Sequence, residues 1–334
     1  MSLTTIGDLA QSYLMRRQNT DLKSQMNTLV QELSSGRTAD LARHLSGSYS
    51  YLADVDRNLS LLEGYDSATN EAKLYTQTMQ DALEGFQTVV SDLGLALMSS
   101  AQSNLPQAVS TTSTRARDDF GALIGRLNTT VGGRSLFAGI DTDMAPMAKA
   151  DDILSALQTA VSGETTLAGV EAVLDTWFAP GGDFDTLAYE GATTSLSPIA
   201  LGAGETVTLD LRADADAFRT LLKHTAMGAL ASDPVLGFDR NLQLELARTA
   251  GEGLTFEQHA LTEIRADLGY AQARIEESGI RISAERTSFQ MARTELLAVD
   301  PYETVTRLED VQFQLEGLYT MTARLSRLSL ADYL

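Results

Sequence analysis

The sequence predicts a mainly α fold, in which long helices from the N- and C-terminal parts form an antiparallel bundle around a smaller mixed α/β insertion. Three observations predict this nested arrangement. Apolar residues recur at helical spacings over residues 4–131 and again over 254–334. Four of the six prolines and the single Trp fall between residues 140 and 240. Aromatic residues are only 6% of the chain although hydrophobic residues are 43%, as in cores built from aliphatic side chains.

The N-terminal part should contain three long helical segments. The first is expected over residues 4–34, with Gly36 available for a left-handed C-cap. Residues 37–50 are ambiguous. The second segment covers 51–104, and Pro106 ends or restarts it. The third covers about 107–131 and should stop at Gly132 and Gly133.

The central part should hold short helices and one β-hairpin. Helices are expected over 152–162 and 167–177, capped by Asp151–Asp152 and Thr165–Thr166. Alternation of polar and apolar residues predicts a strand over 206–211, which pairs with 195–201 across the turn Gly202–Gly204. A further helix should follow over 214–230.

The C-terminal part carries the most regular pattern, seven large apolar residues spaced seven apart: Leu254, Leu261, Leu268, Ile275, Ile282, Phe289 and Leu296. Asp300, Pro301 and Glu303 then form a helix-start signature. The apolar phase changes there, so residues 300–334 should be a separate helix. We therefore expect three domains: 1–40 with 300–334, 41–140 with 241–299, and 141–240.

The two end helices each carry one modest apolar stripe, which is marginal for an isolated pair in water. We therefore expect these stripes to form an assembly interface. Its predicted residues are Leu22, Met26, Leu29, Leu33, Leu308, Val311, Leu315, Leu318, Leu325 and Leu328.

Composition argues against several classes of function. A formal net charge of −20 disfavours nucleic acid and anionic membranes as partners. The chain has no cysteine, no stretch typical of a secretory signal and no membrane span. Its three histidines lack metal-ligand spacing. No glycine-rich or acidic motif meets its spacing requirement, so we expect no enzyme activity, no cofactor and no metal site.

Several segments resemble the flagellin-like axial proteins of the bacterial flagellum. Residues 29–37, LVQELSSGR, are similar to the family's N-terminal LSSG stretch, although residues 38–50 lack the paired aspartates that follow it in flagellins. Residues 133–139, GRSLFAG, with Pro146 are similar to a segment of the hook-associated members of the family. The ending SRLSLADYL is similar to the ending of the same members.

This resemblance implies a flagellin-like nested topology and a structural role at the junction of hook and filament. The implied partners are further copies of the chain in a ring, the hook-associated protein FlgK, flagellin, the flagellar export apparatus and an export chaperone. The implied location is the extracellular flagellum, reached without a cleaved signal peptide. A filament flagellin is the first alternative. A cytoplasmic helical-hairpin signalling protein is a more distant one.

Overall fold

The computed structural model describes residues 6–45, 49–103 and 105–331, and within them the side chains of 10–45, 49–103, 105 and 107–324. The protein divides into two compact units. Unit 1 is formed by the chain up to residue 62 and from residue 284 onward, and unit 2 by residues 63–283. The bounds of these two units differ from those of the three domains that the sequence predicts. The division into three domains stays a prediction.

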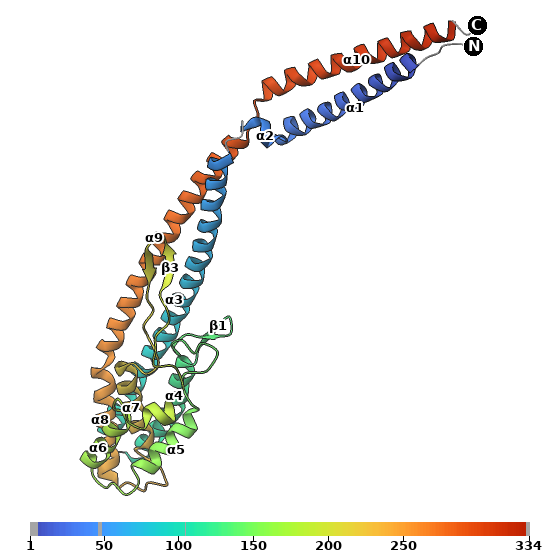
Figure 1. The fold of residues 1–334 in the computed structure, drawn as a ribbon. Helices are drawn as coiled ribbons and strands as arrows, with labels where there is room; N and C mark the ends of the chain where they lie inside the picture. Colours follow the sequence, from blue (N-terminus) through green and yellow to red (C-terminus); the bar gives the residue numbers. More distant parts are fainter. Residues whose placement is uncertain (1–5, 46–48, 104, 332–334) are drawn as a thin grey trace. The chain divides into compact units, whose positions relative to one another are not determined.

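Unit 1 consists of long helices from the two ends of the chain. Helix α1 (Ile6–Ser35) lies beside α10 (Pro301–Ala331), and the start of α1 is next to the end of α10, so the two run antiparallel (Figure 1). The short helix α2 (Leu41–His44) follows α1. The beginning of α3 (Tyr49–Ser103) and the end of α9 (Gln258–Leu297) complete the unit.

The two connections of unit 1 are tied together by backbone hydrogen bonds. Gly36 ends α1 with a φ of 66°, which confirms the predicted left-handed cap. The amide of Thr38 donates to the carbonyl of Leu297 at 2.9 Å, and the amide of Val299 donates to the carbonyl of Gly36 at 3.2 Å. These bonds form an antiparallel bridge between Arg37 and Ala298.

Unit 2 is built on helices that pack around one large apolar core. Besides its parts of α3 and α9, it contains α4 (Pro106–Leu127), α7 (Asp216–Leu230) and α8 (Arg240–Phe256). The shorter α5 (Ala150–Ala160), α6 (Leu167–Phe178) and the π-helical turn η1 (Phe184–Ala188) pack against them. Large side chains from distant parts of the chain meet in the core; Phe86 and Phe218, for example, have ring centroids 5.3 Å apart.

Two small antiparallel hairpins accompany these helices. Strands β1 (Thr130–Val131) and β2 (Arg134–Ser135) turn at Gly132 and Gly133, whose φ values of 59° and 80° favour glycine. Strands β3 (Ile199–Gly202) and β4 (Glu205–Val207) turn at Gly204, with a register shift between Ala200 and Gly202. The fold is therefore mainly α with a small mixed α/β insertion, as the sequence predicts.

Four local predictions are wrong in informative ways. The helix predicted over 107–131 ends at Leu127, because the chain turns into the first hairpin. Asp151 and Asp152 lie in the first turn of α5, where they complement the helix dipole without capping it. The strand predicted over 206–211 pairs only as far as Val207. The heptads from Leu254 span a helix break at Glu257, between α8 and α9.

Candidate assembly surface

The register between α1 and α10 follows from contacts along their length. The hydroxyl of Thr322 lies 4.0 Å from the sulfur of Met15, and the ammonium of Lys23 lies 5.9 Å from the ring centroid of Tyr319. Hydrogen bonds from Asn19 and Lys23 to the phenol lower the pKa of Tyr319. These contacts and the bridge at Arg37 fix one antiparallel register over the described part of the pair.

Most of the predicted assembly residues lie on the facing sides of this pair. Leu22, Met26 and Leu29 of α1 are half-buried, and the register places them opposite the turns of α10 that contain Leu315, Val311 and Leu308. On α10, Val311 and Leu315 are only 7% and 6% exposed, whereas Leu308 and Leu318 are half-buried. Their first role is to join α1 to α10 within one chain.

The remaining predicted residues do not share this position. Leu33 is exposed, near the end of α1. Leu325 and Leu328 belong to α10, but their side chains lie outside the described part of the structure, as do residues 332–334 of the predicted ending. The predicted stripe is thus the seam of a two-helix pair over its described length.

The outward sides of the pair carry large apolar side chains that the sequence pattern missed. On α10 these include Phe313 and Tyr302, which are 76% and 83% exposed, and Met321. On α1 they include Tyr13 and Leu14. None of them belongs to the stripe of spacings three and four that identified the seam. Both helices of the pair therefore expose large apolar side chains in the single chain.

Side chains stabilise the start of α10 and the turn that follows α1. Asp300 accepts hydrogen bonds from the amides of Tyr302 and Glu303, at 2.8 and 3.3 Å, which confirms the predicted N-cap of α10. Glu32, only 8% exposed, accepts from the amide of Ala39 at 2.8 Å and so fixes the turn after α1. These bonds mark where α10 begins and how the chain turns after α1 ends.

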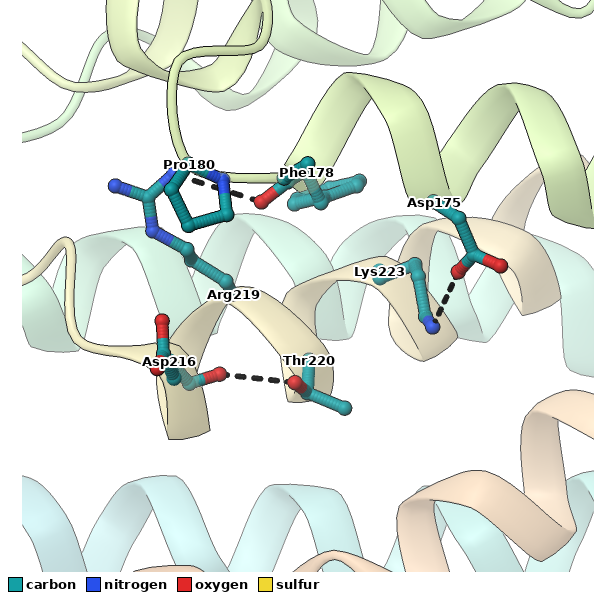
Figure 2. Close-up of a pocket in the computed structure, with 8 residues that line it drawn as sticks. Asp175, Phe178, Pro180, Asp216, Arg219, Thr220 and Lys223 are labelled. Atoms are coloured by element: carbon teal, nitrogen blue, oxygen red, sulfur yellow. Dashed lines mark hydrogen bonds and ion pairs between the residues drawn. The ribbon is translucent and has the colours of Figure 1, made fainter.

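A polar pocket in unit 2 is the other candidate site. It has a volume of about 390 Å³ and lies between α6 and α7, with Arg219 and Lys223 among its lining residues (Figure 2). Figure 2 shows Lys223 directed at Asp175, to which its ammonium donates at 2.8 Å. The guanidinium of Arg219 is paired with Asp185 and donates to the carbonyl of Asp214. Because carboxylates already neutralise both cations, neither Arg219 nor Lys223 is free to bind an anionic ligand.

Metal binding finds no support in the parts of the chain that the structure describes, because no three acidic or histidine side chains gather there as a set of ligands. Asp185 lies in the acidic segment 181–185, one of the motifs that fail the spacing requirement; it accepts from the amide of Gly181 at 2.6 Å and pairs with Arg219. Within the same described ranges, no helix has the length and apolar character needed to cross a membrane.

Long helices from both ends of the chain lie side by side, and each carries exposed apolar side chains. Comparison with known families identifies the class of protein to which this arrangement belongs. The model of the bacterial flagellin N-terminal helical region matches residues 6–142, and that of the bacterial flagellin C-terminal helical region matches residues 255–334. The chain belongs to the flagellin-like family of bacterial axial proteins.

Membership in this family makes the chain a structural protein of the bacterial flagellum that associates with its own kind in the axial structure. No curated protein matches the sequence. Among solved structures, one assigned as a flagellar hook-associated protein from Vibrio parahaemolyticus is 14% identical, with a TM-score of 0.43. The match covers 71% of this chain and 95% of that one.

Proposed function

We propose that this chain is a hook–filament junction subunit of the FlgL type, which connects the hook-associated protein FlgK to the flagellin filament. Two segments of the sequence favour the junction over the filament itself. One is the stretch from Gly133 to Pro146, and the other is the ending SLADYL. In the structure, the first segment begins at the β1–β2 turn, and its Leu136 and Phe137 are fully buried in the core of unit 2.

The observation that carries the assembly role is the outer surface of the α1–α10 pair. Seven of the predicted assembly residues lie along the seam of the pair, whereas Phe313, Tyr302 and Tyr13 are exposed and would be covered by neighbouring copies. Copies arranged in a ring would remove these side chains from water, at roughly 25 cal/mol for each Å² of apolar surface buried. Export by the flagellar type III apparatus, with a chaperone, is the route that this role requires.

Localisation tests the junction role directly. A small fluorescent tag can be inserted at the exposed turn of Gly163, which belongs to unit 2 and not to either end helix. We expect one focus of fluorescence at the base of each filament. Fluorescence along the whole filament would refute the junction role and favour the alternative of a filament flagellin.

The assembly surface is tested by paired substitutions. Phe313→Ser removes an exposed side chain of α10, and Val235→Ser removes one of similar exposure, 78%, from unit 2. We expect only Phe313→Ser to prevent cells from attaching filaments, with circular dichroism of the purified protein unchanged. Equal attachment by the two variants would count against this surface. Deletion of residues 315–334 should abolish attachment while unit 2 stays folded.

A further inference from the structure

The β3–β4 hairpin is fastened to α9 by two arginines near its turn. Arg281 forms an ion pair with Glu205 and also donates to the hydroxyl of Ser278 at 3.2 Å. Arg274, two turns earlier on α9, donates to the carbonyl of Thr206 at 3.2 Å. Each contact joins one residue of β4 to a cation of α9.

Beyond Val207 the chain leaves the hairpin but stays extended beside α9. Residues 208–211 have no strand partner in the described part of the structure. None of their amides donates to another backbone group there. Leu209 is buried, whereas Thr208 and Asp210 are exposed, so the segment keeps the alternation of a strand.

A groove of about 310 Å³ separates this segment from α9. Met79, Leu209 and Leu268, each less than 9% exposed, form its apolar floor. Asp210 and Asp267 line it from opposite sides, both exposed and neither in an ion pair of the described structure. Between β4 and α9, each contact near the hairpin turn joins a residue of β4 to an arginine of α9. In the groove, by contrast, carboxylates stand on both sides, and the small side chain of Ala271 leaves space for a cation.

We propose that this groove binds an extended segment of another protein that carries a Lys or Arg between apolar residues. The head group of that residue would lie between Asp210 and Asp267, and its aliphatic stem would lie on the floor, as such side chains do at apolar surfaces. The backbone of the segment would pair with residues 208–211 in the way that strands add to an open edge.

A foreign chain fits this groove better than a second copy. Each copy has a formal net charge of −20, so charge attraction does not draw a second copy to Asp210 and Asp267, whereas it does draw a basic partner. The described arginines of unit 2 that flank the groove, Arg274 and Arg265, are already bound to Thr206 and to Gln87. This inference does not depend on the position of the protein in the flagellum.

Binding of a capped, fluorescent Val-Lys-Val-Lys-Val peptide to the full chain, followed by fluorescence anisotropy, tests the groove. We expect saturable binding at low salt, and no binding of the matched Val-Glu-Val-Glu-Val peptide. The double variant Asp210→Asn/Asp267→Asn should weaken binding about fivefold or more, as for removal of two charge-assisted contacts. Ala271→Trp, which fills the groove, should abolish it.

The control is Glu276→Gln/Glu277→Gln, which makes the same change of charge at exposed positions of α9. Binding by this variant should stay within about twofold of the wild type, since distant surface charges are screened by salt. Absence of saturable binding, or equal weakening by the two double variants, would overturn the proposal. So would sedimentation showing self-association of the wild type that Asp210→Asn/Asp267→Asn removes, because the occupant would then be a second copy.

Discussion

Acidification should destabilise unit 2 through His224, a residue of α7 that packs on α8. A Cβ atom at Gly253 would lie closer to Cε1 of His224 than van der Waals contact allows. The imidazole ring therefore packs directly on the backbone of α8. Its Nδ1 is buried and has no hydrogen-bond partner. Burial, and secondarily the charge of Lys223, lower the pKa of His224 to about 4, with Asp175 opposing the shift. The folded protein therefore holds this histidine neutral.

The size of the effect follows from proton linkage. The unfolded chain binds a proton near the ordinary histidine pKa of about 6.5, and the folded chain only near 4. The contribution of His224 is thus complete above the unfolded pKa and is lost progressively as the pH falls through the folded one. The expected loss is about 1.4 kcal/mol at pH 5.5 and about 2.5 kcal/mol at pH 4.5.

Urea unfolding followed by the fluorescence of Trp177 measures this loss. Trp177, in α6, is the only Trp of the chain and is 3% exposed. Its ring centroid lies 4.7 Å from that of Phe178, so its fluorescence reports on the packing of unit 2. The control is His224→Phe, which keeps a ring that cannot be protonated. The wild type should lose more stability than His224→Phe between neutral pH and pH 4.5, by about 2.5 kcal/mol. A difference between the two proteins that does not change with pH would refute the reasoning.

Three further substitutions test contacts in the two units. Gly253→Ala should destabilise unit 2 by about 1–3 kcal/mol, because the methyl group displaces the His224 ring, and an unchanged urea midpoint would contradict this packing. Arg219→Met should cost about 2 kcal/mol by leaving Asp185 without its cation, measured by the same Trp177 fluorescence, and Asp185→Asn added to it should recover part of the loss. Asp300→Ala should cost about 1 kcal/mol through loss of the α10 cap and reduce the helical circular dichroism on heating, whereas Asp300→Ser should behave as the wild type.

The long helices could be predicted from the sequence because their pattern repeats. The five heptad positions from Leu254 to Ile282 are all buried, as a sustained apolar period requires. The break at Glu257 could not be predicted, because no proline or glycine stands at that residue and the period runs across it. The prediction that the strand continues after Val207 is wrong for a related reason. Alternation shows that Leu209 faces inward, but it does not show what pairs with the backbone.

The seam between α1 and α10 was predictable for the same reason as the heptads. Val311 and Leu315 recur at helical spacing, and they are the buried apolar residues of the described part of α10. Phe313 and Tyr302 were missed, because single apolar residues on a helix surface are common and carry no periodic signal. The structure shows that α1 and α10 of the same chain fill the seam, whereas the side chains of Phe313 and Tyr302 remain exposed.

The bridge between Arg37 and Ala298 has a consequence for the order in which the chain folds. Nearby, Arg293 of α9 donates to Asp56 of α3 at 2.7 Å across 237 residues of sequence. Closing a loop of that length in an unfolded chain costs about 5 kcal/mol of entropy. Within unit 2, α3 and α9 are already held together by Gln80 and Arg265. The contacts between α3 and α9, once formed, shorten the loop that the α1–α10 pair has to close, so we expect that pair to form last.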